Sequence, residues 1–258
     1  DVFARCLSKQ VEEVASEIRA GGRNEYEILE AGAGSGILAA DLLRALQETS
    51  PPARYNILER SAHLRQVQKE TLEKHVPEWL DNIHWLDTPP RDAWQGIFIA
   101  NEVLDALVVD RFRIDSDGIK EMKVSWGQDG FEWHMTPASG ALLERIEAVI
   151  ATLDEKPGVG YQSELNLLLP PWLDTVTSSL EAGLALFIDY GYTTASYYHP
   201  QRSDGTLICH YRHRAHDDPF QWPGLTDISC SVDFTALAEA ADSCGLAVCG
   251  YTTQSMFL

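Results

Sequence analysis

The sequence predicts an α/β protein built on a mostly parallel sheet with helices on both faces. Short β-prone runs alternate with segments whose apolar residues recur at helical spacing, which is typical of this class. A glycine-rich turn joins the first such strand to the helix that follows it. Two later runs, 96–100 and 183–188, are continuously apolar, as expected of parallel strands buried on both faces. The 258 residues suffice for one large domain or two small ones.

The glycine turn is Glu-Ala-Gly-Ala-Gly-Ser-Gly at 30–36, between a predicted strand at 26–29 and a helix at 37–46. Such a turn brings a ligand against backbone N–H groups at a helix N-terminus, and glycine allows positive φ and close approach. Its G-x-G-x-G spacing differs from the G-x-G-x-x-G dinucleotide fingerprint. Glu59 closes the next strand, 55–59, where a carboxylate can accept hydrogen bonds from two ribose hydroxyls. A glycine turn alone is often only a turn, and the two acids favour a binding site.

The rest of the predicted sheet domain follows from caps and breakers. A helical stripe at 1–20 ends at two glycines, and a helix at 62–75 ends before Pro77. A strand at 82–86 ends in Asp87. The later expected elements are a return to the sheet at 158–166, a helix at 170–180, a helix from 234, and a closing strand or strand pair at 245–253.

A change of texture near residue 109 interrupts this alternation. Three short alternating segments, 109–114, 119–126 and 131–134, are separated by turn residues and predict a β-meander. A helix is expected from about 139 to 153. We therefore expect 109–160 to be a lobe inserted beside the site, between residues 1–108 and 161–258 of the sheet domain.

Polar residues gather where the two buried strands end. Asn101, Glu102 and Asp105 follow the first strand, and Asp189 with Tyr190 follows the second. In an open α/β sheet the carboxyl ends of the strands face the ligand crevice. A helix cap accounts for Asn101 alone, so the acids favour a functional interpretation.

Composition excludes several classes. The net charge of −19 disfavours nucleic acid and suits a basic partner, although solubility alone is an equal explanation. No apolar run approaches the ~20 residues that span a bilayer, so we expect no membrane span. Five cysteines without a C-x-x-C pair indicate a reducing compartment. His210, His213 and His216 do not converge at this spacing on a strand or loop, so no metal is predicted.

Two resemblances sharpen this interpretation. The acid, the glycine loop and the second acid resemble the class I S-adenosylmethionine (SAM) methyltransferases. More specific motifs resemble the MidA family, the mitochondrial complex I assembly methyltransferase and its bacterial relatives. These motifs are Asn-Glu-Val-Leu-Asp-Ala at 101–106, Gly-Tyr-Gln-Ser-Glu at 160–164, Asp-Tyr-Gly at 189–191, Gly-Thr-Leu at 205–207, Tyr-Arg-His-Arg at 211–214, Asp-Ile at 227–228 and Val-Asp-Phe at 232–234. Two departures are Val108 and Val109 where a proline is expected, and Ser-Cys-Ser at 229–231 in place of a more usual Thr-Ala-His.

The resemblance implies a Rossmann-like, seven-stranded SAM-binding domain that leaves S-adenosylhomocysteine as product. In this family pattern Asp87 is placed to bond the adenine amino group. The implied cofactor-binding residues are Glu30, Gly32, Gly34, Gly36, Glu59, Asp87 and Asn101. The mitochondrial member methylates arginine in a complex I subunit, which implies a basic, arginine-bearing protein substrate.

An arginine acceptor sets the chemistry that the site must supply. A guanidinium is protonated near neutral pH, so carboxylates must pair with it, orient it and take the released proton. The candidate catalytic residues are Glu102, Asp105 and Asp189, with Glu164 as a secondary one. We expect the cytoplasm for a bacterial protein and the mitochondrial matrix for a eukaryotic one.

Two alternatives remain at this stage. The first is a SAM-binding assembly or regulatory protein with vestigial catalysis, whose acidic surface docks a basic partner. The second is an NAD-dependent oxidoreductase, which the G-x-G-x-G spacing and the absence of a Tyr-x-x-x-Lys pair disfavour.

Overall fold

The computed structural model describes residues 2–212 and 214–258, which form two compact units. Unit one comprises the residues up to Val103 with Leu173–Ile188 and Val248–Leu258, and unit two comprises Leu104–Trp172 and Asp189–Ala247. The expected division was an insertion at 109–160 within one larger domain. The structure differs because the strand that follows the insertion, residues 162–165, pairs with the insertion rather than with the parallel sheet, and residues 189–247 also belong to the second unit.

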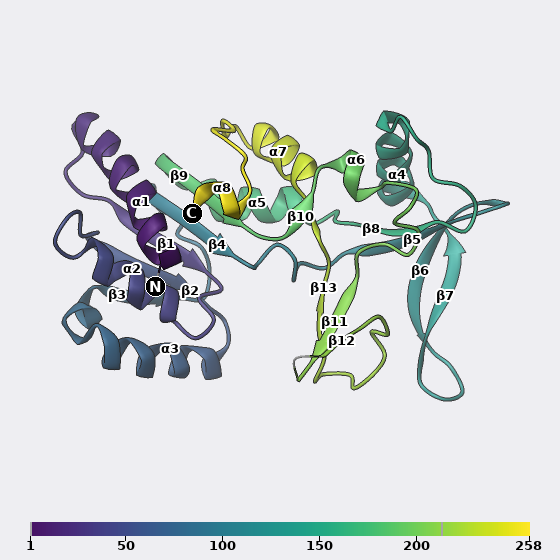
Figure 1. Ribbon diagram of the computed structural model, residues 1–258, viewed down its shortest axis with the longest axis horizontal. Helices are drawn as coiled ribbons and strands as arrows, with labels where there is room; N and C mark the ends of the chain where they lie inside the picture. The colour runs from purple at the N-terminus through teal and green to yellow at the C-terminus, as the bar shows by residue number, and fades with distance from the viewer. Residues whose placement is uncertain (1, 213) are drawn as a thin grey trace. The chain divides into compact units, whose positions relative to one another are not determined.

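A five-stranded, fully parallel sheet forms the centre of unit one, with the strand order β3-β2-β1-β4-β9 (Figure 1). The α/β class with a parallel sheet is therefore confirmed, whereas the described residues supply five strands to it and not seven. No strand forms over 245–253, which instead leads to the short helix α8 (Gln254–Phe257). The strands are β1 (Glu27–Ala31), β2 (Arg54–Leu58), β3 (Ile83–Leu86), β4 (Trp94–Asn101) and β9 (Leu180–Ile188).

Helices α1 (Val2–Ala20), α2 (Ile37–Leu46) and α3 (Ala62–His75) share one hydrophobic core with this sheet. Apolar residues on the buried stripe of α1, such as Leu7 and Val11, join Ile28 of β1 and Ile97 of β4 there. Phe98, on the opposite face of β4 from Ile97, is also fully buried. The continuous apolar run at 96–100 is therefore covered on both faces, as predicted. A 3-10 helix (Pro77–Asn82) and α5 (Leu169–Thr177) complete the helical connections of β3 and β9.

Unit two begins with the predicted meander, β5 (Asp110–Asp115), β6 (Gly118–Trp126) and β7 (Phe131–Pro137). The strand expected to return to the parallel sheet, β8 (Gln162–Leu165), instead pairs antiparallel with β5. Helix α4 (Gly140–Thr152) packs Leu142 and Ile146 against Phe112 of β5. Strands β5, β6 and β8 and helix α4 thus share a core of their own, which Tyr197 and Tyr198 also join.

The remainder of unit two, residues 189–247, contains short strands and helices. Two small sheets are present, one with the order β12-β11-β13 and one that pairs β10 with β14. Asp233 caps α7 by accepting hydrogen bonds from the backbone N–H groups of Thr235 and Ala236. The elements are β10 (Gly191–Tyr192), α6 (Thr194–Tyr197), β11 (Ile208–Tyr211), β12 (Arg214–His216), β13 (Asp227–Ser229), β14 (Val232–Asp233) and α7 (Phe234–Ser243). Among the helices that the structure describes, none combines the length and the apolar character that crossing a bilayer requires.

Candidate functional site

Adjacent strand ends align at one edge of the sheet in unit one. Ala31 of β1 lies opposite Leu58 of β2 and Ala100 of β4, and Leu58 lies opposite Leu86 of β3. The residues that follow these positions are therefore neighbours along that edge. They are the predicted cofactor-binding residues Gly32, Glu59, Asp87 and Asn101.

The glycine loop turns out of β1 through three left-handed residues. Gly32, Gly34 and Gly36 have φ values of 64°, 53° and 80°, which residues with a Cβ adopt only with strain. A Cβ built on Gly34 would meet no heavy atom within 4 Å, whereas one on Gly36 would come within 3.2 Å of the Gln68 Cα. Gly34 therefore borders open space, and Gly36, which also begins α2, allows close packing against α3. The predicted strand, glycine turn and helix are all present.

Gln68 organises the side chains beneath this loop. Its buried amide donates hydrogen bonds to the carbonyl of Gly34 at 3.1 Å and to Glu59 Oε2 at 3.2 Å, and accepts one from Trp85 Nε1 at 3.0 Å. Glu59 Oε1 accepts the backbone N–H of Ser61 at 2.8 Å. Glu59 is thus fixed from both of its oxygens while its side chain remains partly exposed. The sequence interpretation missed Gln68; the available signal was a polar residue one turn before Leu72 on the buried face of α3.

Glu30 lies within the protein rather than on its surface. The residue is 2% exposed, and its carboxylate accepts a hydrogen bond from the Tyr55 hydroxyl at 2.7 Å. Burial raises the pKa of Glu30 to about 7, with the Tyr55 hydrogen bond opposing that shift. Its contacts are those of a residue that supports the glycine loop from below, and direct contact with a cofactor stays a prediction.

Asp87 is the most exposed of the predicted cofactor-binding side chains, at 82%. Its carboxylate pairs with Arg65 at 2.8 Å, and Arg65 also donates to the carbonyl of Glu59 at 2.7 Å. Arg65 therefore ties the ends of β2 and β3 together. Asn101 is the last residue of β4 and is partly exposed.

Glu102 follows β4 with the left-handed φ of 50°, although it carries a side chain. Its backbone N–H donates to the carbonyl of Ile188 at 2.8 Å, which fixes this conformation against the end of β9. The side chain itself is exposed. Strained, non-glycine conformations of this kind cluster at functional sites, so the strain adds to the catalytic prediction for Glu102.

The two other primary catalytic candidates, Asp105 and Asp189, lie together in unit two. Asp189 Oδ2 accepts the backbone N–H groups of Leu104 at 3.0 Å and Asp105 at 3.2 Å. Burial, followed by the charge of Asp105, raises the pKa of Asp189 to about 6. The Asp189 carboxylate thus positions the backbone that carries Asp105, and its catalytic role stays a prediction.

Tyr190 completes this cluster. Its hydroxyl donates to Asp105 Oδ2 at 2.8 Å and lies 2.6 Å from Ser229 Oγ. Burial and the neighbouring carboxylates raise the pKa of Tyr190, so it stays a phenol at physiological pH. The other oxygen of Asp105, Oδ1, is buried and has no hydrogen-bond partner among the described residues. An unpaired buried carboxylate oxygen is costly, which points to a donor that a ligand would supply.

Glu164, the secondary candidate, is fully buried and belongs to a separate ion pair. Its carboxylate lies 3.0 Å from Arg111 Nε and accepts the backbone N–H of Thr206 at 2.7 Å. A Cβ on Gly205 would come within 2.4 Å of it. These contacts use Glu164 to fasten the segment at 205–206 to β5 and β8, and its catalytic role stays a prediction.

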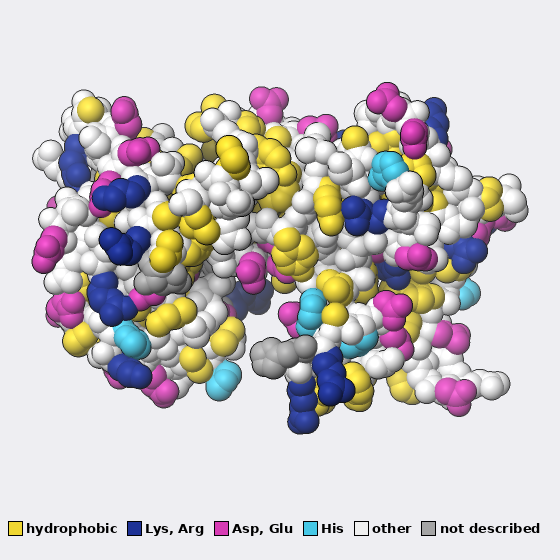
Figure 2. Space-filling view, in the orientation of Figure 1, with side chains coloured by type: hydrophobic (Ala, Val, Ile, Leu, Met, Phe, Trp, Pro, Cys, Tyr) yellow, Lys and Arg dark blue, Asp and Glu magenta, His cyan; other side chains and the backbone are white. Residues whose placement is uncertain are grey.

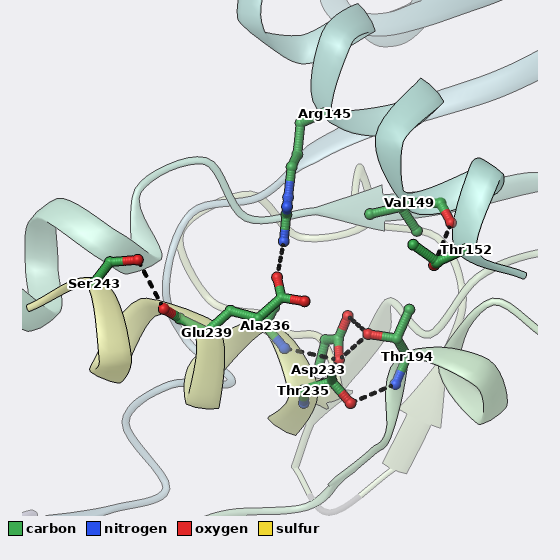
Figure 3. Close-up of polar contacts among 9 residues, drawn as sticks. All are labelled: Arg145, Val149, Thr152, Thr194, Asp233, Thr235, Ala236, Glu239 and Ser243. Atoms are coloured by element: carbon green, nitrogen blue, oxygen red, sulfur yellow. Dashed lines mark hydrogen bonds and ion pairs between the residues drawn. The ribbon is translucent and has the colours of Figure 1, made fainter. Parts of the chain in front are cut away.

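A cavity of about 310 Å³ also lies within unit two. Its walls include Val149 of α4 and Ala240 of α7, and these helices are linked by the ion pair of Arg145 and Glu239 at 2.6 Å (Figure 3). Glu164 lines the cavity, whereas no predicted cofactor-binding residue does. The described residues contain no cluster of metal-ligating side chains, and His213 of the histidine series lies outside the described residues.

An open parallel sheet whose first strand ends in an exposed glycine loop and whose second ends in an anchored acid defines a protein of the nucleotide-cofactor-binding α/β class. The chain belongs to the family described as "Putative S-adenosyl-L-methionine-dependent methyltransferase", whose model matches residues 6–252.

Relatives with described functions support this assignment. The mitochondrial protein arginine methyltransferase NDUFAF7 of Danio rerio is 25% identical over 279 residues, which cover 95% of this chain and 60% of that protein. The Caenorhabditis elegans homologue, also mitochondrial, is 25% identical over 84% of this chain and 53% of its own length. The chain therefore spans little more than half the length of these relatives.

Solved structures are similar as well. A Burkholderia thailandensis protein crystallised with S-adenosyl-homocysteine is 39% identical, with a TM-score of 0.83 over 94% of this chain and 60% of that one. A native structure of a protein from the same organism gives a TM-score of 0.88 over 98% of this chain and 65% of that one, again at 39% identity.

Proposed function

We propose that this chain is the SAM-binding and catalytic part of a methyltransferase that modifies arginine in a protein substrate. The observation that carries the proposal is the 39% identical structure with bound S-adenosyl-homocysteine, which matches 94% of this chain. The names of the mitochondrial relatives supply the arginine acceptor. SAM is a methyl donor, and S-adenosylhomocysteine is the product of its use.

The residues in unit one fit such a cofactor. The space beside Gly34 is open, and a side chain there would occupy it. Glu59 accepts one hydrogen bond at each oxygen from the protein, which leaves lone pairs on both for a pair of ribose hydroxyls. Gly32, Gly34, Gly36 and Glu59 would hold the cofactor, with Asp87 at its adenine, and the bound SAM would supply a methyl group on a sulfonium.

Unit two supplies carboxylates suited to a cationic acceptor. A guanidinium is charged near neutral pH, so it needs acids that pair with it and accept a proton as the methyl group is transferred. Asp105 offers a buried oxygen with no partner among the described residues, next to Asp189, whose pKa is raised to about 6. Glu102, which follows β4 in unit one, is the third candidate for this work.

Cofactor binding is tested by calorimetric titration of SAM and S-adenosylhomocysteine. Gly34→Val should abolish binding, because its side chain enters the space beside the loop. Gly22→Val is the matched control, since Gly22 also has a left-handed φ of 83° and open surroundings, at the end of α1. Native SAM affinity in Gly34→Val would contradict the placement of the cofactor at this loop.

Catalysis and acceptor class are tested separately. Labelled SAM and candidate complex I subunits should give methylarginine in the native protein, detected by mass spectrometry. SAM binding with no transfer to any candidate would favour the assembly or regulatory alternative. A thermal-shift comparison of SAM and NAD tests the oxidoreductase alternative, because a ligand raises the melting temperature of the protein that binds it. A shift with NAD and none with SAM would favour the oxidoreductase.

A further inference from the structure

The hairpin of β6 and β7 ends in an exposed aromatic pair. Trp126 and Phe131 lie directly opposite each other beside the turn, with ring centroids 5.0 Å apart and an edge-to-face angle of 86°. Trp126 is 73% exposed and Phe131 is 44% exposed. Two more rings extend this pair into an aromatic row within unit two. The ring centroids of Phe131 and Phe220 are 6.3 Å apart, and those of Phe220 and Trp133 are 4.9 Å apart.

Hairpin stability does not account for this exposure. A cross-strand aromatic pair contributes roughly 0.2–1 kcal/mol, and smaller β-formers would leave less apolar surface in water. Val124, on the same strand as Trp126, is also exposed. Large apolar side chains that gather at an exposed position mark interaction surfaces.

The same hairpin end is acidic. Asp129 in the turn is exposed, Glu132 is exposed on the opposite face of the hairpin from Phe131, and residues 124–132 contain no Lys or Arg. Figure 2 shows acidic and hydrophobic side chains side by side over the free end of this hairpin. Asp217 and Asp218, close in sequence to Phe220, add further negative charge. The surface therefore fits a partner that is both cationic and able to stack on rings.

A guanidinium meets both requirements, and the aromatic row already holds one. The guanidinium carbon of Arg111 lies over the Trp133 ring at 5.2 Å from its centroid. Guanidinium groups stack flat on aromatic faces and pair with carboxylates through two N–H groups, whereas the compact, strongly hydrated ammonium of lysine does so less well.

We propose that the surface formed by Trp126, Phe131 and the turn residue Asp129 docks an arginine-bearing, basic segment of the protein substrate. The choice of partner rests on the proposed function, because a protein arginine methyltransferase must hold such segments. The docking contact is distinct from the residues assigned to cofactor binding and to methyl transfer.

Binding of two model peptides tests this inference. The probes are twelve-residue peptides of alternating Arg and Gly and of alternating Lys and Gly, titrated calorimetrically at about 0.15 M salt. The native protein should bind the arginine peptide several-fold more tightly than the lysine peptide. Trp126→Ala should weaken the arginine peptide by about 5- to 10-fold and remove most of that preference. Trp126→Leu, which keeps an apolar side chain, should lose the preference as well.

Matched controls separate this contact from general acidity. Asp129→Asn should weaken both peptides, whereas Asp154→Asn, at an exposed acid outside the hairpin, should leave them within two-fold. Val159→Ala removes an exposed apolar side chain elsewhere in unit two and should have no effect. SAM affinity should be unchanged in every hairpin variant.

Three outcomes would overturn the inference. They are equal affinity for the two peptides, native affinity in Trp126→Ala, and a dimer in sedimentation velocity that Trp126→Ala dissolves. The last result would assign the aromatic row to contact between copies of this chain. Failure of the proposed function is distinguishable, because it appears as absent SAM binding or methyl transfer in the native protein whatever the peptides do.

Discussion

The Tyr55 hydroxyl donates a hydrogen bond to the Glu30 carboxylate at 2.7 Å, at a position where both side chains are closed off from solvent. Glu30 directly precedes Ala31 and the glycine loop, and Tyr55 lies on the neighbouring strand β2. Burial raises the pKa of Glu30 to about 7, from 4.5. The floor of the glycine loop therefore contains an acid that titrates near physiological pH.

This pair predicts a pH-dependent stability. Between pH 4.5 and about 7 the folded protein holds a proton at Glu30 that the unfolded chain has released. The free energy of unfolding therefore falls as pH rises through that window. Glu30→Gln, which is never charged, should remove this fall, a relative gain of roughly 3 kcal/mol at pH 8 compared with pH 4. Urea titrations of native protein and variant at the two pH values measure it.

Tyr55→Phe is the partner experiment. It removes the hydrogen bond that favours the charged form of Glu30, so it should destabilise the protein more at pH 8 than at pH 4. Parallel pH profiles for the native protein and Glu30→Gln would show that Glu30 does not titrate in this window.

Gln68 should control cofactor affinity without touching the cofactor. Gln68→Ala frees Glu59 Oε2 and the Gly34 carbonyl from their shared donor, and should weaken SAM binding by about 10-fold. Gln66→Ala on the same helix, where the exposed side chain donates a hydrogen bond to exposed Glu70, should leave affinity unchanged. Calorimetric titration of both variants measures the difference, and equal affinities would mean that Glu59 is held well enough by Ser61 alone.

The sequence predicted correctly the elements that depend on residues close together in the chain, such as helix caps, glycine turns and apolar runs. Helix α3 begins after the capping residue Ser61 and runs from Ala62 to His75, the predicted bounds. The glycine turn and the buried strand β4 were found for the same reason. Glycines, which permit positive φ, and continuous apolar runs can both be read from the sequence. The meander, predicted over 109–134 and observed over 110–137, followed from its tight turns.

Long-range pairing was the part that sequence did not reveal. The β8 segment has β character in either sheet, and its partner β5 lies about fifty residues earlier in the chain. The segment 245–253 is rich in β-formers such as Val248, yet it forms no strand and Val248 remains exposed. Gln68 joined the site only through tertiary packing, since nothing adjacent in sequence links it to Gly34.

Two substitutions at Glu102 test its backbone strain and its side-chain charge separately. Glu102→Gly relieves the strain and should raise the free energy of unfolding by about 1 kcal/mol, because glycine adopts positive φ freely. Glu102→Gln keeps the strain and should give no such gain. Both variants should keep SAM affinity within a few-fold and lose methyl transfer by orders of magnitude. Retained transfer in Glu102→Gly would remove Glu102 from the catalytic residues.

Asp105 should govern the titration of Asp189. The like charge of Asp105 is one cause of the raised pKa of Asp189, after burial, so Asp105→Asn should lower that pKa. Carboxyl-carbon NMR titration of the two proteins follows it directly. Asp110→Asn is the control, because the charge of Asp110 is not among the causes of the Asp189 shift.

Protonation of Asp189 should lower the rate of methyl transfer. Asp189 is charged above about pH 6 and protonated below it. Protonation converts one of the two oxygens that accept backbone N–H groups into a hydroxyl that donates, which weakens these contacts. Methyl transfer should therefore fall on the acid side of about pH 6, and the fall should move to lower pH in any Asp105→Asn protein that keeps measurable activity. An unmoved Asp189 titration in that variant would show that burial alone sets its pKa and that the two carboxylates act independently.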